Sequence, residues 1–330
     1  MTERNKVDIK ENDVLRYDSQ LLTILLKDNS TKQNIIWATD NYVLYGSKYA
    51  ANEQITTPLI TGKSGNIIKP RVEKNKKEQI ARVRDKAEVF TPSWICNKQN
   101  NLVDKAWFET ENIFNIELVN GWTTQTRPIL FPSKTGKTWQ DYVLEERLEV
   151  SCGEAPYLVS RYDTISGDPI PTKDRIGLLD RKLRIIAENT NSESEWFNWA
   201  KTAVQSIYGF EWQGDNLLLA RENILYSFAD YYQDKFKRKP FKDYMLEIAN
   251  ILSWNIWQMD GLKGVVPNSC RDLKVTSYNL FETVEEIVPC EGCLKNNIYK
   301  HNGIYCKIKD WKTGGTLKYV SLLKGENHGK

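Results

Sequence analysis

Two strand-like segments, each carrying an acid, constrain the fold of this chain more than any other feature. Residues 148–158 read LEVSCGEAPYL, an apolar strand with an acid that runs into a tight turn at Gly153. Residues 207–211 read IYGFE and end in Glu211, just ahead of a run with helical spacing at residues 215–223. In open α/β sheets, such a glycine turn lets a nucleoside approach the backbone, and an acid after the next strand binds its ribose hydroxyls. The pair therefore predicts a nucleoside site at one edge of a parallel sheet.

The spacing of apolar residues elsewhere favours the same class of fold. Helical periodicity is expected around residues 178–187, 192–207, 222–236 and 241–254, with short strands between these stretches. Strands that alternate with helices are typical of an α/β fold with a mainly parallel sheet. We expect a main domain over residues 86–330, preceded by a mixed α/β extension over residues 1–85.

Composition limits the class of protein without naming a partner. The chain has 330 residues, of which 40% are hydrophobic and 27% charged, so it can bury a full core. No apolar run approaches the roughly 20 residues that span a bilayer, and no signal core follows the polar N-terminus. We therefore expect a cytoplasmic protein without a membrane segment. The net charge of +3 neither requires nor excludes nucleic acid.

Residues 69–86 form a basic stretch with two interpretations. The stretch is either a solvated helix face or a segment that contacts phosphates, since clustered lysines and arginines supply most of nonspecific DNA affinity. A Thr-Pro pair follows it, and the pair predicts a helix start with Thr91 as the cap and Pro92 at the first helical position.

Four segments occur in an order that resembles the adenine-N6 DNA methyltransferases, the modification subunits of restriction systems. They are residues 90–92 (FTP), 148–158, 208–211 (YGFE) and 258–262 (QMDGL), and together they cover roughly residues 85–265. The resemblance implies a Rossmann-like fold that binds S-adenosylmethionine (AdoMet) and transfers its methyl group to DNA. It also implies a specificity or nuclease subunit as a partner. The cofactor-binding residues it implies are Phe90, Thr91, Pro92, Glu149, Cys152, Gly153, Glu211, Trp212 and Asp260.

The chain departs from this family at two places. Ala155 stands where the family has the last glycine of the first loop, and a Cβ there narrows the approach of the cofactor. The family's catalytic tetrapeptide, an Asp, Asn or Ser followed by Pro-Pro and an aromatic residue, is absent, because the chain contains no Pro-Pro pair. An alternative function is therefore a catalytically inactive subunit that binds DNA or partner proteins.

Two segments are candidates for the catalytic loop. Asp310 and Trp311 follow a strand-like run, where an acid would accept hydrogen bonds from the target amino group and a ring would stack on the flipped base. Residues 40–42, Asp-Asn-Tyr, offer the same chemistry near the start of the chain, in a place the family does not use.

A cluster of soft ligands near the end of the chain points to zinc. Cys290, Cys293, His301 and Cys306 give four such ligands within a Cys-rich hairpin expected at residues 286–310. Cys270 is an alternative to His301 in this set. The opposing interpretation is a set of reduced thiols in a hairpin that binds no metal.

Overall fold

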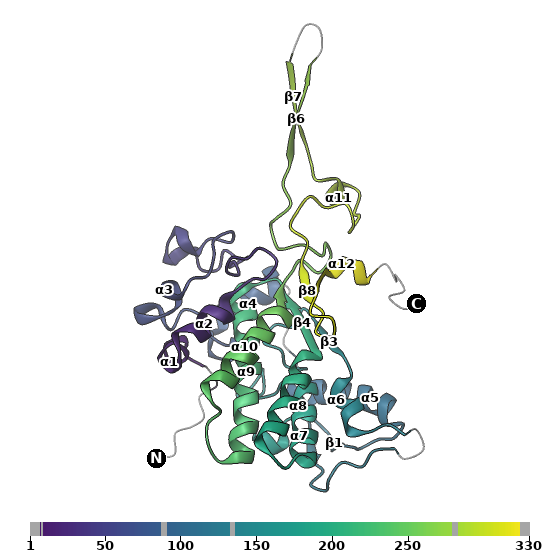
Figure 1. Cartoon of the computed structure of the whole chain (residues 1–330). Coiled ribbons are helices and arrows are strands. Elements are labelled where there is room, and N and C mark those ends of the chain that lie inside the picture. Colours follow the sequence, from purple (N-terminus) through teal and green to yellow (C-terminus); the bar gives the residue numbers. More distant parts are fainter. Residues whose placement is uncertain (1–6, 8, 87–90, 133–135, 279–282, 324–330) are drawn as a thin grey trace.

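Helices and four small sheets make up this computed structural model, which describes residues 7, 9–86, 91–132, 136–278 and 283–323 (Figure 1). The fold is mixed α/β, and three of its four sheets are antiparallel pairs of strands. Over these described ranges, no helix combines the length and apolar character that crossing a bilayer requires.

A three-stranded parallel sheet lies at the centre of the molecule. Its strands are β3 (Arg147–Val150), β4 (Ile207–Glu211) and β5 (Ile256–Gln258), in the order β3-β4-β5. The first two strands lie where the sequence predicted them, and they run parallel as expected. A parallel sheet was predicted, and this small sheet is the parallel one among the four sheets of the described residues.

Two helices connect each pair of neighbouring parallel strands. These are α7 (Leu178–Asn189) and α8 (Glu193–Gln205) between β3 and β4, and α9 (Gly214–Phe236) and α10 (Lys242–Asn255) between β4 and β5. The helices bury apolar residues that recur at the helical spacing used to predict them. Along α8, Trp196, Ala200 and Ala203 are fully inaccessible to solvent.

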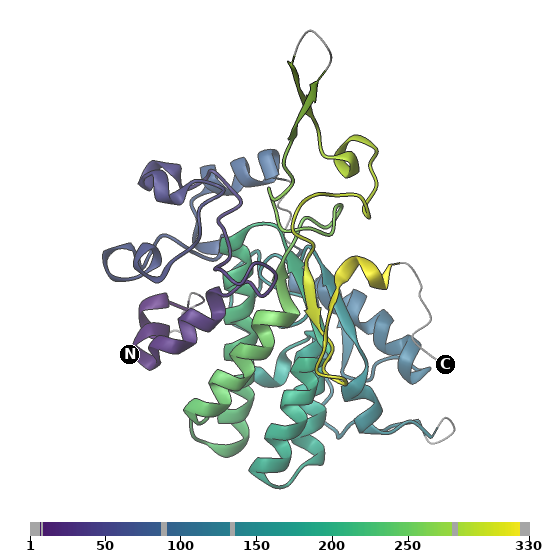
Figure 2. The same ribbon diagram turned by 45° about the horizontal axis from the view of Figure 1, so that its top comes forward.

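The two faces of the central sheet bury different clusters. Ile207 and Ile256 belong to the large core formed with the helices, whereas Phe210 and Trp257 pack into a smaller cluster. Ile308 of the short strand β8 (Lys307–Lys309) joins that smaller cluster. Figure 2 shows the C-terminal strands beside the sheet, on the side away from the purple N-terminal part.

The chain before residue 60 is held against the ends of the central strands. The backbone N–H of Gly214 donates to the carbonyl of Trp37 at 3.0 Å, and Gln258 Nε2 donates to the carbonyl of Ile36 at 2.8 Å. A Cβ on Gly214 would lie 2.1 Å from the Ile36 carbonyl oxygen, so this close approach requires glycine. Residues 36 and 37 of the expected N-terminal extension are therefore hydrogen-bonded to Gly214 and Gln258, which lie at the carboxyl ends of β4 and β5.

The basic stretch is partly folded inward, which argues against a phosphate-contacting role for its whole length. Lys74 and Arg82 are buried, and their cationic groups lie 3.5 and 2.7 Å from the carboxylate of Asp215. Lys76 and Lys77, at the start of α4 (Lys76–Lys86), are exposed.

The helix after the Thr-Pro pair begins one residue later than predicted. Helix α5 (Ser93–Phe108) has Pro92 at its cap position, and Thr91 makes no capping bond. The carboxylate of Asp163 accepts from the Ser93 N–H at 2.8 Å instead, so a distant acid replaces the local cap.

A two-stranded hairpin projects from the body of the molecule (Figure 1). It consists of β6 (Leu273–Tyr278) and β7 (Thr283–Val288), which pair with each other in an antiparallel register. The short helix α11 (Glu291–Leu294) follows at its base.

The remaining elements are α1 (Glu11–Tyr17), α2 (Ser19–Leu26), α3 (Thr57–Ile60), β1 (Asn115–Leu118), β2 (Gly121–Thr124), α6 (Trp139–Leu144), β9 (Thr316–Lys318) and α12 (Tyr319–Leu322), with short 3₁₀ helices at η1 (Val43–Tyr45), η2 (Ser47–Tyr49), η3 (Gly62–Ser64), η4 (Arg71–Glu73) and η5 (Thr172–Asp174).

Candidate functional site

A cavity of about 770 Å³ lies at the carboxyl ends of β3 and β4. This volume falls within the range of roughly 300–1,000 Å³ that is common for small-molecule sites. Most of the predicted cofactor residues that the structure describes line it. They are Thr91, Glu149, Cys152, Gly153, Glu211 and Trp212.

The loop after β3 takes the tight form that the sequence predicted. Ser151, Gly153 and Ala155 all adopt left-handed backbone angles, with φ of 50°, 54° and 63°. Ala155 therefore keeps the conformation of the glycine it replaces, at a cost of about 1 kcal/mol. Its side chain packs in the core and is not among the groups that line the cavity, so it does not narrow the cofactor's approach as expected.

Glu149 holds this loop in place. Its two carboxyl oxygens accept from the backbone N–H groups of Tyr157 and Leu158, at 3.3 and 3.1 Å. Burial raises the pKa of Glu149 to about 8, although these donors lower it and the nearby Glu211 carboxylate raises it further. At neutral pH Glu149 is therefore largely protonated.

Glu211 joins the ends of the two strands. Its carboxylate accepts from the backbone N–H of Gly153 at 2.9 Å and from that of Gln213 at 3.1 Å. The two adjacent hydroxyls of a ribose are donors of the kind that an acid at the end of such a strand binds. The acid lies at the position where the sequence predicted a ribose contact.

An aromatic ring and a polar edge complete the cavity. The Trp212 side chain is 37% exposed, and its Nε1 donates to the carbonyl of Ala38 at 2.9 Å, which fixes one edge of the ring. Gln213, Asn216 and Asn268 also line the cavity, and no motif in the sequence pointed to them. The only local signal for Asn268 is an asparagine between a proline and a serine, which is typical of a turn.

The other predicted cofactor residues have different places. Phe90 lies outside the described residues, and Pro92 caps α5. Cys152 is buried, and burial raises the pKa of its thiol well above the ordinary value, so it acts as a packing residue. Asp260 closes a turn by accepting from Leu262 N at 3.1 Å, and it is not among the cavity's lining residues.

Asp310 and Trp311 lie at the opposite end of the sheet from the cavity. Trp311 Nε1 donates to Asn255 Oδ1 at 2.8 Å, and Asn255 Nδ2 donates to the carbonyl of Ile207, the first residue of β4. The cavity lies at the last residue of that strand, about 13 Å away at the usual rise per residue. The structure therefore does not bring this predicted catalytic pair to the cavity.

Asp40, from the second catalytic candidate, does line the cavity. Its Oδ1 accepts from the Ala51 N–H at 3.1 Å, and the side chain is exposed. Tyr42 of the same segment cannot stack on a base, because it is buried and its hydroxyl donates to Asp215 at 2.6 Å. Asp40 is thus the acid that the N-terminal part contributes to the site.

A larger hollow of about 860 Å³ lies elsewhere, beside α9. Its two arginines share one acid, since Arg161 and Arg175 lie 3.2 and 2.6 Å from Asp230, and Lys173 and Lys237 also line it. It lacks the strand ends and glycine turn that make the first cavity suitable for a nucleoside.

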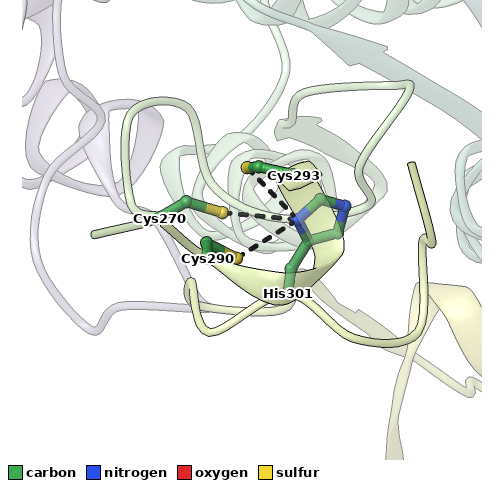
Figure 3. Close-up of side chains that lie close together, drawn as sticks. All are labelled: Cys270, Cys290, Cys293 and His301. Carbon is green, nitrogen blue, oxygen red and sulfur yellow. Dashed lines mark hydrogen bonds between the residues drawn. The ribbon is translucent and has the colours of Figure 1, made fainter. Parts of the chain in front are cut away.

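The predicted metal ligands gather at the base of the hairpin, with one exchange. Cys270, Cys290, Cys293 and His301 form a cluster whose ligand atoms all lie within 4.8 Å of one another (Figure 3). Cys306 is not a member: its thiol donates to the carbonyl of Gln258 at 3.3 Å, in the small cluster behind the sheet. The predicted set was therefore wrong at Cys306, and Cys270 takes that place while His301 stays.

No protein-family model matches this chain, and searches of curated proteins and of solved structures return no significant match.

Proposed function

We propose that the cavity at the ends of β3 and β4 binds S-adenosylmethionine. We further propose that the chain is a DNA adenine-N6 methyltransferase, the modification subunit of a restriction-type defence system. The observation that carries the proposal is the meeting of Glu149, Gly153 and Glu211 around one cavity at the ends of adjacent parallel strands.

The ribose and the adenine of the cofactor each have a matching group in the cavity. Glu211 faces the space where ribose hydroxyls would lie, and the exposed ring of Trp212 offers a surface for adenine. The sulfonium and amino groups of the cofactor are cationic, and acidic side chains attract such groups. A parallel β3-β4-β5 sheet with helical crossovers is the part of a Rossmann-like fold that such a cofactor uses.

Asp40 is the group that we propose for the target base. Its exposed carboxylate borders the cavity, where it would accept hydrogen bonds from an exocyclic amino group. Direct transfer from sulfonium to nitrogen needs no covalent intermediate, so the protein contributes position and electrostatics. The target adenine must leave the duplex stack to reach this depth.

One feature of the sheet favours the alternative, a subunit that acts through a partner chain. Within the described residues, β3 is hydrogen-bonded to β4 alone. Its Leu148 and Val150 side chains are 47% and 63% exposed. An open strand edge with apolar side chains is a surface on which proteins pair with other chains.

Calorimetric titration with AdoMet tests the proposal directly. We expect Glu211→Ala to bind AdoMet at least about tenfold more weakly than the wild type does, because hydrogen bonds to a charged group contribute about 1.5–3 kcal/mol each. Asp310→Ala is the matched control, since Asp310 lies at the far end of the sheet, and its affinity should equal that of the wild type. Absent binding by a folded wild type, or equal affinity in Glu211→Ala, would contradict the proposal.

A methyl-transfer assay on DNA separates the two functions. If the chain is an enzyme, Asp40→Ala should abolish transfer and leave AdoMet affinity unchanged. AdoMet binding without transfer by the wild type would instead support the non-catalytic subunit, and transfer that survives in Asp40→Ala would exclude Asp40 from the reaction.

A further inference from the structure

We propose that Cys270, Cys290, Cys293 and His301 bind one zinc ion, and that this ion fixes the base of the β6–β7 hairpin to the body. The proposal is independent of the cofactor site. It assigns a ligand set and a structural role to the cluster described above.

The distances within the cluster are those of a zinc tetrahedron. His301 Nδ1 lies 3.6 Å from Cys270 Sγ, 3.7 Å from Cys290 Sγ and 3.6 Å from Cys293 Sγ. Zinc bonds of about 2.3 Å to sulfur and about 2.0–2.1 Å to nitrogen, set at the tetrahedral angle, give a nitrogen–sulfur edge of about 3.6 Å. Figure 3 shows the three sulfurs directed toward this one nitrogen.

Two glycines allow the ligands to approach so closely. A Cβ on Gly292 would lie 2.6 Å from His301 Nδ1, and a Cβ on Gly303 would lie 3.0 Å from Cys270 Sγ. Gly292 lies within helix α11, where alanine is intrinsically favoured over glycine. The close packing of His301 therefore explains a glycine that local helix preference opposes.

The surroundings of the ligands stabilise thiolates and orient the imidazole. The backbone N–H of Asn302 donates to Cys290 Sγ at 3.2 Å, which offsets part of the charge on sulfur. Tyr305 accepts from the His301 backbone N–H at 2.9 Å and donates to the carbonyl of Ile298 at 3.0 Å, so it fixes the loop that carries the histidine. Such outer contacts are typical of metal sites.

The ligand chemistry selects zinc over other occupants. Three thiolates and an imidazole are soft ligands in tetrahedral array, which suits zinc and excludes calcium and magnesium. A disulfide would need one sulfur pair at about 2.05 Å. All of these cysteines are free, and each of the three sulfurs is nearly equidistant from His301.

The ligands bracket the projecting hairpin. Cys270 precedes the first residue of β6 by three positions, and Cys290 follows the last residue of β7 by two. A two-stranded hairpin is only marginally stable by itself, and β6 and β7 pair only with each other in the described part of the chain. A metal ion bound by Cys270 and Cys290 would hold the two ends of the hairpin together, which its own strand pairing does only weakly.

Elemental analysis of the purified full-length chain tests the ligand set. We expect about one zinc per chain in the wild type and in Cys306→Ser, the matched control, and a loss of at least tenfold in occupancy in Cys293→Ser. Cys293 is exposed, so its replacement by serine disturbs little packing. Zinc-free wild type, another metal at stoichiometric amounts, or zinc lost equally from both variants would overturn the assignment.

A glycine pair tests the geometry without removing a ligand. Gly292→Ala should weaken zinc affinity, measured by competition with a chromogenic chelator, whereas Gly121→Ala should not, because a Cβ at Gly121 meets no atom within 4 Å. Equal affinities in the two variants would overturn the proposed packing around His301.

Hydrogen exchange tests the structural role. Removing zinc with a chelator should speed amide exchange at least tenfold in β6 and β7 and leave β4 unchanged. Unchanged protection of the hairpin would refute the structural role of the ion, even if zinc is bound.

Discussion

Replacing Asp215 with asparagine should destabilise the protein strongly, because this acid ties the N-terminal part to the cavity. Asp215 lies in the first turn of α9 with a fully buried side chain. Its Oδ2 accepts from the Tyr42 hydroxyl at 2.6 Å and lies 2.7 Å from Arg82 and 3.5 Å from Lys74. Asparagine keeps the shape of the side chain and removes its charge.

The expected magnitude follows from the two buried cations. Removing one partner of a buried ion pair costs about 3–5 kcal/mol, because the other charge stays buried without compensation. With a urea dependence of about 3 kcal/mol per molar, the unfolding midpoint should fall by about 1 M or more. Burial alone would raise the pKa of Asp215, but Arg82 and Lys74 hold it well below its ordinary value. The stabilisation is therefore present at neutral pH and is lost only as the pH falls below that ordinary value.

Urea unfolding at pH 7, followed by circular dichroism, measures the effect. The control is Asp13→Asn, which removes a solvent-exposed partner of Arg16 and should cost less than about 1 kcal/mol. A cycle with Arg82→Gln should show that the two changes are not additive. The explanation is refuted if Asp215→Asn costs no more than Asp13→Asn, or if its effect adds fully to that of Arg82→Gln.

Two further predictions concern the cavity. Because burial raises the pKa of Glu149 to about 8 from an ordinary value of 4.5, the folded chain retains a proton that the unfolded chain releases. The unfolding free energy of the wild type should therefore decrease as the pH rises from about 5 to about 8, and this decrease should be smaller in Glu149→Gln. Urea midpoints that change with pH in parallel for the two proteins would contradict this explanation. Gly214→Ala should cost about 2 kcal/mol or more and expose residues 36–38 to protease, because its Cβ meets the Ile36 carbonyl; wild-type stability and cleavage would count against that contact.

Local signals in the sequence predicted the central part of the fold. The strand at residues 207–211 and the four helices at residues 178–255 have apolar spacing that matches their burial in the structure. The strand at residues 147–150 lies where it was predicted, but its apolar Leu148 and Val150 are exposed and its Glu149 is buried. The glycine turn was predicted as well, since the left-handed angle at Gly153 is a property of a few adjacent residues. Gly153 and Glu211 in the cavity followed from the strand ends, whereas Cys152 and Trp212 were implied by the family resemblance.

Contacts between distant segments could not be predicted in the same way. The basic stretch resembled a solvated face because nothing near it in the sequence indicates that Lys74 and Arg82 pair with Asp215, more than 130 residues away. The metal set failed at Cys306 for a similar reason. The sequence spacing places Cys306 near Cys290 and Cys293, but in the structure its thiol points to the carbonyl of Gln258 in the sheet. Cys270, which precedes the hairpin in the sequence, joins the cluster instead.

The place of the acid proposed for the target base depends on where the chain goes after β5. From Gln258 it enters a turn closed by Asp260 and then the hairpin, and it returns at β8 on the face of the sheet that carries Phe210. The chain passes from Cys306, beside the carbonyl of Gln258 at the end of β5, to Trp311, beside Asn255 just before the start of β5. Asp310 therefore cannot reach the carboxyl ends of β3 and β4. Residues 36–40 can, because the bonds to Gly214, Gln258 and Trp212 hold them there. If the chain transfers methyl groups, the acid at the target base comes from the start of the chain, which makes Asp40 the residue to change first.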